Sequence, residues 1–194
     1  MACYIYPPYY QVKVNTGGGI LVSDSIFIQV YPSAQLPVVN DTAVCKGNTL
    51  QLNVQGNDTY KWYNELTGGS IIASGNSFVQ TNVLTPFSIY LDAVTINGCS
   101  ATNREKIQVN VNPLPTVDFS QNVEMDNGSY VTTFNPSCSG ADAYSWNFNG
   151  IDSSNLESPE YIFTVDGVYT ITLVATNTQT GCSNSIQKNV DIHV

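Results

Sequence analysis

Residues 169–174 read Tyr-Thr-Ile-Thr-Leu-Val, a run in which large apolar side chains alternate with smaller ones. In an extended chain successive side chains point to opposite faces, so this run predicts a strand with one face in a core. No stretch of the sequence shows the 3, 4, 7 spacing of an amphipathic helix. Similar alternating runs occur at residues 11–14, 26–30, 50–54 and 107–111. Clusters of Gly, Asn, Asp and Pro separate the runs, so the sequence predicts an all-β protein made of antiparallel sandwiches.

The composition excludes several classes of function. Charged residues make up 11% of the 194 residues, against about 25% in an average protein, whereas 57 residues are Asn, Ser or Thr. The net charge of −9 would repel a phosphate backbone, so nucleic acid is not an expected partner. The apolar runs are only a few residues long, far short of the roughly 20 that span a bilayer. We therefore expect no direct insertion into a membrane.

The N-terminus carries no sign of export by itself. Residues 1–8, Met-Ala-Cys-Tyr-Ile-Tyr-Pro-Pro, lack the basic and apolar regions of a signal peptide. The interior of the chain nevertheless has the character of an extracellular protein. We therefore expect Met1 to be an artificial start and the chain to be a slice of a longer secreted polypeptide.

Three segments repeat one pattern, a tyrosine that opens a strand followed by a Gly/Asn-rich turn and a second alternating strand. The tyrosines are Tyr10, Tyr90 and Tyr169, which lie 80 and 79 residues apart. This spacing matches a small seven-stranded sandwich, and prolines follow the first two copies, as suits linkers. The sequence predicts a terminal β-hairpin at residues 1–32, the remnant of a preceding module, and complete modules at 33–113 and 114–194.

The last module resembles the PKD (polycystic kidney disease) domain, an immunoglobulin-like β-sandwich. Residues 144–150 read Tyr-Ser-Trp-Asn-Phe-Asn-Gly, and residues 158–173 contain the later Pro, Tyr and Gly-Xaa-Tyr-Xaa-Ile-Xaa-Leu pattern of that family. Asn147 replaces the first Asp of the family's turn, so a carboxylate role at that turn is not carried over. The residues in register with the family pattern are Trp146, Phe148, Pro159, Gly167, Tyr169, Ile171 and Leu173.

The middle module resembles the Ig-like repeats of very large surface proteins of Bacteroidetes-type bacteria. The resemblance rests on Cys-Lys-Gly at residues 45–47, Tyr-Lys-Trp-Tyr at 60–63 and Gly-Cys at 98–99. Such repeats often stand beside PKD domains in adhesins, gliding-motility proteins and secreted enzymes exported by type IX secretion. The tandem order implies two Ig-like sandwiches that serve as a spacer or an adhesive stalk, although a fold by itself does not prove a role.

Six residues are expected to be signatures of the core and fold. Trp62 and Trp146 lie where a sandwich places its central tryptophan. Asp166-Gly167-Val168-Tyr169 has the form of a tyrosine corner, whose hydroxyl bonds to the backbone. The full set is Trp62, Tyr90, Trp146, Phe148, Gly167 and Tyr169.

The cysteines are interpreted as disulfides. Within the modules they pair as Cys45 with Cys99 and Cys138 with Cys182, each time joining an early segment to the last hairpin. Loops of this length would stabilise each module by about 4 kcal/mol in the chain-entropy model, and disulfides imply an oxidising compartment. Cys3 is left over, either paired in the missing part of the first module or free.

Catalysis and cofactors find little support in the sequence. There is one histidine, His193, and no Gly-Xaa-Ser-Xaa-Gly motif, so we expect no enzyme and no cofactor. Acid is concentrated in residues 113–194, with a formal charge of −8 against −1 for residues 33–112. Five loop carboxylates are a possible calcium site, although a solvated acidic face is the preferred interpretation. They are Asp142, Asp152, Glu157, Glu160 and Asp166.

Aromatic and hydroxyl residues raise the possibility of glycan chemistry. Strand alternation places Tyr63 on the face opposite Trp62, where an exposed ring would stack on a sugar. Asp-Ser-Ile and Asp-Thr-Ala make Ser25 and Thr42 candidates for O-glycosylation of the Bacteroidetes type. Three Asn-Xaa-Ser/Thr sequons begin at Asn40, Asn57 and Asn127, and they would be idle in a bacterium.

The sequence thus predicts a non-catalytic, disulfide-stapled spacer and adhesion module of a larger bacterial protein, extracellular and either surface-bound or secreted. Its expected partners are the other domains of the same polypeptide and a surface glycan or protein. Two alternatives stay open: a structural subunit of a filament or phage particle, and a carbohydrate-binding appendage of a secreted enzyme.

Overall fold

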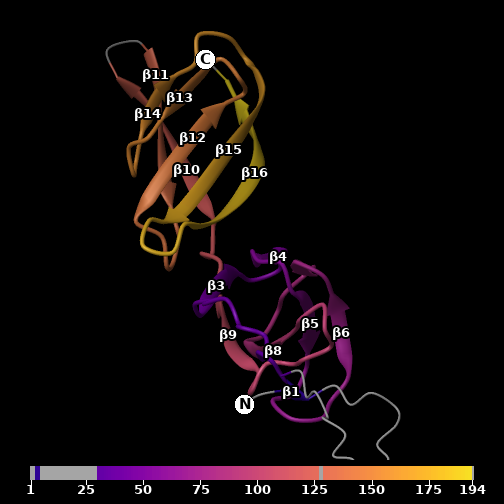
Figure 1. Ribbon diagram of the computed structural model, residues 1–194. Coiled ribbons are helices and arrows are strands. Elements are labelled where there is room, and N and C mark those ends of the chain that lie inside the picture. The colour runs from indigo at the N-terminus through magenta and orange to yellow at the C-terminus, as the bar shows by residue number, and fades with distance from the viewer. Residues whose placement is uncertain (1–2, 5–29, 127–128, 194) are drawn as a thin grey trace, which may run out of the picture. The chain divides into compact units, whose positions relative to one another are not determined.

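The computed structural model describes residues 3–4, 30–126 and 129–193, and every regular element among them is a β-strand (Figure 1). This confirms the predicted all-β class. Near the start, β1 (Cys3–Tyr4) pairs antiparallel with β2 (Val30–Tyr31). The rest of the predicted terminal hairpin, including Tyr10 and Ser25, lies outside the described residues.

The part of the chain after β2 first forms a five-stranded sheet in the order β3-β9-β8-β5-β6 and a two-stranded sheet β4-β7. Trp62 and Phe78 come from different sheets and their ring centroids lie 5.6 Å apart, so the two sheets face each other across a core. The strands are β3 (Thr42–Cys45), β4 (Leu50–Asn53), β5 (Thr59–Tyr63), β6 (Ile71–Ser74), β7 (Ser77–Gln80), β8 (Phe87–Val94) and β9 (Glu105–Asn112).

The C-terminal part repeats this plan with a three-stranded sheet, β10-β11-β14, and a four-stranded sheet, β13-β12-β15-β16. Phe134 and Trp146 come from the two sheets, and their ring centroids lie 5.6 Å apart. The strands are β10 (Phe119–Asp126), β11 (Ser129–Pro136), β12 (Ala143–Phe148), β13 (Asp152–Ser154), β14 (Glu160–Ile162), β15 (Gly167–Asn177) and β16 (Cys182–Ile192).

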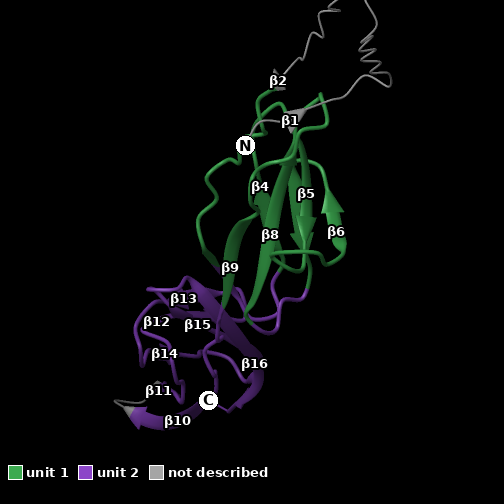
Figure 2. Cartoon of the chain, turned by 60° about the horizontal axis from the view of Figure 1, so that its bottom comes forward, with its two compact units in different colours: residues 1–42, 49–81, 86–110 green, residues 43–48, 82–85, 111–194 purple. Residues whose placement is uncertain are grey.

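The chain forms two compact units whose limits interleave along the sequence (Figure 2). Besides residues 111–194, the second unit contains two short segments, 43–48 and 82–85. The Gly47 N–H donates to Val83 O at 2.7 Å, and the Val83 N–H donates to Asn48 O at 3.0 Å. Backbone hydrogen bonds therefore join the two short segments to each other inside the second unit.

Each unit has a tryptophan–leucine pair at the centre of its larger sheet. Trp62 on β5 pairs in register with Leu91 on β8, and Trp146 on β12 pairs with Leu173 on β15. All four side chains are almost fully buried. The two sandwiches therefore have equivalent centres, which the sequence alone shows only as two tryptophans.

The indole N–H groups of these tryptophans find equivalent partners. Trp62 Nε1 donates to Gly75 O, and Trp146 Nε1 donates to Leu156 O, both at 3.0 Å. Gly75 lies between β6 and β7, and Leu156 lies between β13 and β14. Both acceptors are thus in segments that cross from one sheet of the sandwich to the other.

Tyr90 does not belong to the core, contrary to the sequence-based expectation. The inward positions of β8 are Ile89 and Leu91, which are buried, and Tyr90 between them is half-buried on the other face. Successive residues of a strand alternate between faces, so a shift of one residue reverses the side on which a residue lies. The repeat that shares a register is Ile-Xaa-Leu-Xaa-Ala at residues 89–93 and 171–175.

The core of the second unit is mainly aromatic. Phe119, Phe134, Trp146, Phe148 and Phe163 are buried in one cluster. The ring of Phe119 meets that of Trp146 edge-on, with centroids 5.2 Å apart, an arrangement that aromatic pairs favour. Aliphatic residues of the four-stranded sheet complete the cluster.

Tyr169 makes the contact of a tyrosine corner at the edge of this cluster. Its hydroxyl donates to Val165 O at 2.8 Å, four residues upstream. Its ring lies 4.4 Å from that of Phe163, centroid to centroid. The residue therefore fixes the loop that leads into β15, which begins at Gly167.

The turn between β12 and β13 is a tight hairpin turn with Asn149 and Gly150 at its centre. Asn149 and Gly150 have φ angles of 55° and 75°, and the Ile151 N–H donates to Phe148 O at 2.9 Å. Left-handed φ at both central residues is typical of a type I′ hairpin turn. Asn147 Oδ1 accepts the Gly150 N–H at 2.8 Å, so the amide performs the turn-closing role without a charge.

Gly150→Ala is expected to destabilise the protein by about 1 kcal/mol, because φ is left-handed there. An added Cβ would meet no atom within 4 Å, so the loss comes from the backbone alone. Asn149→Gly is the matched control and should change the free energy of unfolding by less than about 0.5 kcal/mol. Urea unfolding measures both variants, and equal stability of Gly150→Ala and the wild type would contradict the turn assignment.

Candidate functional site

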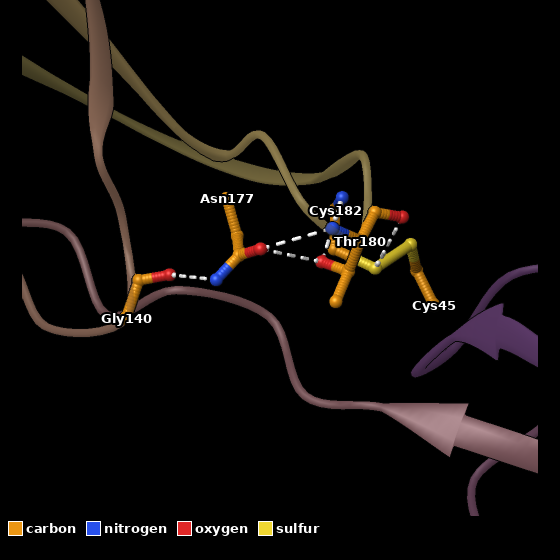
Figure 3. Close-up of a disulfide and its surroundings, with 5 residues drawn as sticks. All are labelled: Cys45, Gly140, Asn177, Thr180 and Cys182. Carbon is orange, nitrogen blue, oxygen red and sulfur yellow. Dashed lines mark hydrogen bonds between the residues drawn. A yellow bond between two sulfur atoms is a disulfide. The ribbon is translucent and has the colours of Figure 1, made fainter.

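The second unit contains a disulfide between Cys45 and Cys182, at the end of β3 and the start of β16. The Cα atoms are 5.6 Å apart, although 137 positions separate the residues in sequence. The turn before Cys182 is held by hydrogen bonds (Figure 3): Asn177 Oδ1 accepts the Thr180 N–H at 3.0 Å, and Asn177 Nδ2 donates to Gly140 O at 3.0 Å. Cys182 therefore follows a turn that the hydrogen bonds of Asn177 hold in place.

The expected pair Cys45–Cys99 is not formed. Cys45 adjoins the end of β9, since the Lys46 N–H donates to Asn112 O at 2.9 Å, whereas Cys99 precedes the start of that strand. A strand of eight residues is about 27 Å long, and disulfide Cα atoms lie less than about 7 Å apart. Cys99 is nevertheless buried and disulfide-bonded.

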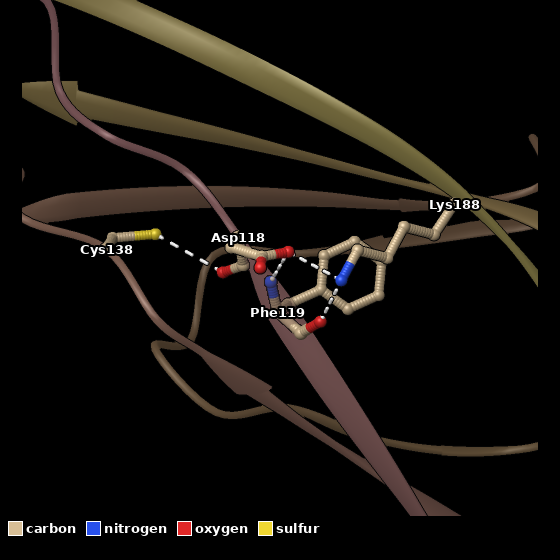
Figure 4. A network of polar contacts seen from close by, with 4 residues as sticks. All are labelled: Asp118, Phe119, Cys138 and Lys188. Atoms are coloured by element: carbon tan, nitrogen blue, oxygen red, sulfur yellow. Dashed lines mark hydrogen bonds and ion pairs between the residues drawn. The ribbon is translucent and has the colours of Figure 1, made fainter.

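The expected pair Cys138–Cys182 is also wrong, because the sulfur of Cys182 is already bonded to Cys45. Cys138 is a half-buried free thiol. Its S–H points to Asp118 O at 3.7 Å (Figure 4). Chain spacing does not determine connectivity, since even four cysteines allow three pairings.

The disulfide map predicts a definite pattern of cross-linked peptides. Proteolysis without reduction should give one linked pair that contains Cys45 and Cys182, and alkylation of the unfolded, unreduced chain should modify Cys138. Mass spectrometry of the digest measures both. A linked peptide that joins Cys138 to Cys182 would contradict the structure.

The five candidate calcium ligands are spread over several segments of the second unit. Asp142 and Glu157 line one cavity of about 520 Å³ together with Tyr144, Ser145 and Asn155. Among the described residues, no group of three or more His, Cys, Asp or Glu is arranged to hold a metal ion. The remaining three candidates lie elsewhere along the chain: Asp152 starts β13, Glu160 starts β14, and Asp166 precedes β15.

The Asp142 carboxylate is already occupied by protein donors. Thr178 donates its hydroxyl to Oδ2 at 2.7 Å and its N–H to Oδ1 at 2.8 Å, and these bonds, the hydroxyl first, lower the pKa of Asp142. Burial, with Glu157 as a smaller cause, raises the pKa of Tyr144 beside it. Calcium binding here stays a prediction, and calcium titration against melting temperature is its test.

Lys188 is part of a polar cluster in the second unit that also contains Asp118, Phe119 and Cys138 (Figure 4). From β16 it makes an ion pair with Asp118 and donates to Phe119 O, and its Nζ lies 4.9 Å from the centroid of the Phe119 ring. Lys188 is the only basic Lys or Arg residue of residues 113–194. It ties β16 to the start of β10, which belongs to the opposite sheet.

The same cluster lowers the pKa of Asp118. The hydrogen bond from Lys188 is the largest cause, and the Phe119 N–H, which donates to Asp118 Oδ1 at 2.9 Å, is the next. A carboxyl whose pKa is lower in the folded than in the unfolded state adds stability above the unfolded-state pKa. That contribution disappears as the pH falls through the folded-state pKa.

Asp118→Asn should therefore lower the melting temperature at neutral pH, and its difference from the wild type should close as the pH falls below about 4. Lys188→Met should lower it as well, whereas Lys106→Met, at an exposed position, should not. Thermal unfolding followed by circular dichroism between pH 2 and 7 measures the three variants. A wild-type advantage over Asp118→Asn that persists unchanged at low pH would contradict this assignment.

Tyr63, the candidate for stacking on a sugar, has one ring face covered. Arg104 lies over it with Cζ 3.3 Å from the ring centroid. Arg104 Nη1 also donates to Glu65 O and Gly68 O, both at 2.7 Å, and so fastens the loop between β5 and β6. Arg104 was missed in the sequence, where its only signal is that it is the single arginine.

A second cavity, of about 450 Å³, lies beside this arginine in the first unit. Its lining includes Asp92 and Arg104, which carry opposite charges, and the apolar side chains of Leu66 and Ala101. Asp92 Oδ1 accepts the N–H of Ala93 at 2.8 Å. The cavity is a candidate place for a polar ligand in this unit.

Of the two O-glycosylation candidates, Ser25 lies outside the described residues. Thr42 is half-exposed at the first position of β3. Its neighbour Asp41 accepts the Gln108 N–H at 2.8 Å, so the aspartate of the motif takes part in local pairing. His193, the sole histidine of the chain, is exposed, and its Nε2 lies 3.4 Å from Asp191 Oδ2.

Two units of facing antiparallel sheets, each with an equivalent tryptophan–leucine centre, define a protein of tandem immunoglobulin-like sandwiches. Residues 32–113 match the family model of the Ig-like domain described as CHU_C associated, and residues 110–194 match that of the PKD domain. The chain thus contains an Ig-like domain followed by a PKD domain, which confirms both resemblances seen in the sequence. The boundaries predicted at residues 32 and 113 stay predictions.

The comparison with solved structures finds similarity to the following three. The PKD1 domain of the Vibrio cholerae metalloprotease PrtV is 22% identical over 42% of this chain and 99% of that chain, with a TM-score of 0.37. The PKD1 domain of Vibrio anguillarum Epp is 21% identical over 43% and 98%, with a TM-score of 0.37. The fibronectin(III)-like modules of Clostridium thermocellum CbhA are 18% identical over 79% and 90%, with a TM-score of 0.41. No curated protein matches the chain.

Both matched domain families are generally non-catalytic modules, and no enzyme family is matched. They are typical of extracellular proteins, and the Cys45–Cys182 disulfide fits that location. Among the described residues there is no helix long and apolar enough to span a membrane.

Proposed function

We propose that this chain is a non-catalytic spacer and adhesion module of a larger bacterial protein that is displayed on the cell surface or secreted. The observation that carries the proposal is the tandem of two disulfide-bonded sandwiches whose conspicuous polar side chains serve the fold. Asp118 and Lys188 tie the two sheets of the second unit together, and Arg104 fastens a loop of the first. Disulfide bonds form and persist in oxidising compartments, which agrees with a location outside the cell.

The low charge and the cross-links suit a module that is exposed outside the cell. Only 11% of the residues are charged, and the surface polarity comes from Asn, Ser and Thr. Such a surface depends little on salt, because few charged pairs are there to be screened. The partners in this proposal are neighbouring domains of the same polypeptide and a surface glycan or protein.

Adhesion is the more specific half of the proposal, and the cavity beside Arg104 supports it. Arg104 and Asp92 supply opposite charges, and Leu66, 52% exposed, supplies an apolar contact. Polar groups beside an apolar surface are the usual means of binding a small ligand. A neutral or zwitterionic glycan fits this lining better than a polyanion, because Asp92 would repel the latter.

The test is the intact mass of the protein from its natural source, measured with and without reduction and combined with sequencing of the chain ends. We expect a polypeptide much longer than 21.1 kDa that contains the Cys45–Cys182 cross-link. A 21.1 kDa chain with reduced cysteines, assembled into particles or filaments, would refute the proposal and favour a structural subunit.

Binding to a glycan array separates adhesion from a pure spacer. The adhesion proposal predicts binding that Leu66→Ser weakens at least threefold and that Ile96→Ser, at another exposed apolar position, leaves unchanged. Equal binding by the wild type and Leu66→Ser would remove the cavity from the proposal.

A further inference from the structure

The Cys45–Cys182 disulfide closes a covalent loop around most of the folded chain. The loop contains every strand from β4 to β15, whereas β1 to β3 precede it and β16 follows it in the chain. We propose that this bond carries tension past the two sandwiches, so that a pull on the two ends of the chain does not extend the residues between the cysteines. This inference rests on the proposed function only for the reason why the chain would come under tension.

The argument is one of covalent path length. A force between the ends follows the shortest covalent route, which runs to Cys45, across the sulfur atoms to Cys182 and onward. The bypassed loop of 137 positions would measure roughly 450–490 Å if fully extended, and the disulfide replaces that length by a Cα–Cα distance of 5.6 Å. A further cross-link at Cys99 can only shorten the route, because an added bond never lengthens a shortest path.

The strand that carries the load after Cys182 is already extended. β16 runs from Cys182 to Ile192 and pairs with β15 along its whole length, from Cys182↔Asn177 to Ile192↔Gly167. Tension between the two ends of one extended strand acts along its own backbone. Transmission of the force therefore does not require the β15–β16 hydrogen bonds to break, and the strand gains little length.

The local structure protects the bond that carries this load. Cys182 is fully buried, and Cys45 is half-buried. The Cys182 N–H donates to Thr180 Oγ1 at 3.3 Å, and the Thr180 hydroxyl donates to Asn177 Oδ1 at 3.1 Å. A thiolate must reach one of the two sulfur atoms to break the bond, so burial of Cys182 restricts attack to the Cys45 side.

Single-molecule pulling of the full 194-residue chain from handles at its two ends tests the proposal. The oxidised wild type should reach a final contour length of roughly 200 Å, the length of the segments outside the loop. The double variant Cys45→Ser with Cys182→Ser should extend further than the wild type, by at most roughly 450–490 Å and by less where the remaining disulfide of Cys99 still withholds length. Cys138→Ser is the matched control, because it removes a free thiol, and it should extend as the wild type does.

The wild-type measurement decides the proposal even if the double variant does not fold. A final contour of the oxidised wild type well above roughly 200 Å, toward the roughly 650 Å of the whole chain, would overturn it. The same wild-type molecules pulled in dithiothreitol should lengthen stepwise to that value as bonds are reduced. Pulling is independent of the cellular location, so a short wild-type contour together with an intracellular 21.1 kDa source protein would refute the proposed function alone.

Discussion

Each sandwich depends on the way it buries one indole ring. A tryptophan brings a large apolar surface into the core together with one N–H group that is costly to leave without an acceptor. In both units the acceptor is a backbone carbonyl, Gly75 O or Leu156 O, at 3.0 Å. Each carbonyl belongs to the segment that crosses between the two sheets. Burial of Trp62 and Trp146 therefore fixes the central sheet and the crossover at the same time.

The sequence predicts which face of a long alternating strand is buried, but it does not fix the register between two repeats. The run at residues 169–174 is long enough that its inward face is unambiguous, and β15 buries Ile171 and Leu173 as alternation requires. The alignment of Tyr90 with Tyr169 is wrong because it matches two tyrosines and not the buried Ile-Xaa-Leu-Xaa-Ala pattern, which defines the true register. A single residue of slip is enough to reverse the face.

The candidate sites were less predictable than the fold, for the same physical reason. The role of Arg104 depends on Tyr63, Glu65 and Gly68, which lie about 40 positions away in sequence, and no local pattern encodes such a meeting. The acidic residues of the second unit are concentrated in sequence, but of the five candidate ligands only Asp142 and Glu157 line the same cavity. Successive loops of an antiparallel sandwich lie at alternate ends of its strands, so closeness in sequence does not by itself bring loop carboxylates together.

The cysteine pairing changes the mechanics of the protein far more than its thermodynamics. In the chain-entropy model the cost of an open loop grows only with the logarithm of its length, so closing 137 positions rather than about 50 adds only about 1 kcal/mol of stability. The length withheld from extension, in contrast, grows in direct proportion to the number of residues enclosed. Two disulfides within separate modules would stabilise each sandwich but leave the chain between them under tension. A single bond from Cys45 to Cys182 gives similar stability per bond and also removes nearly the whole folded part from the path of the force.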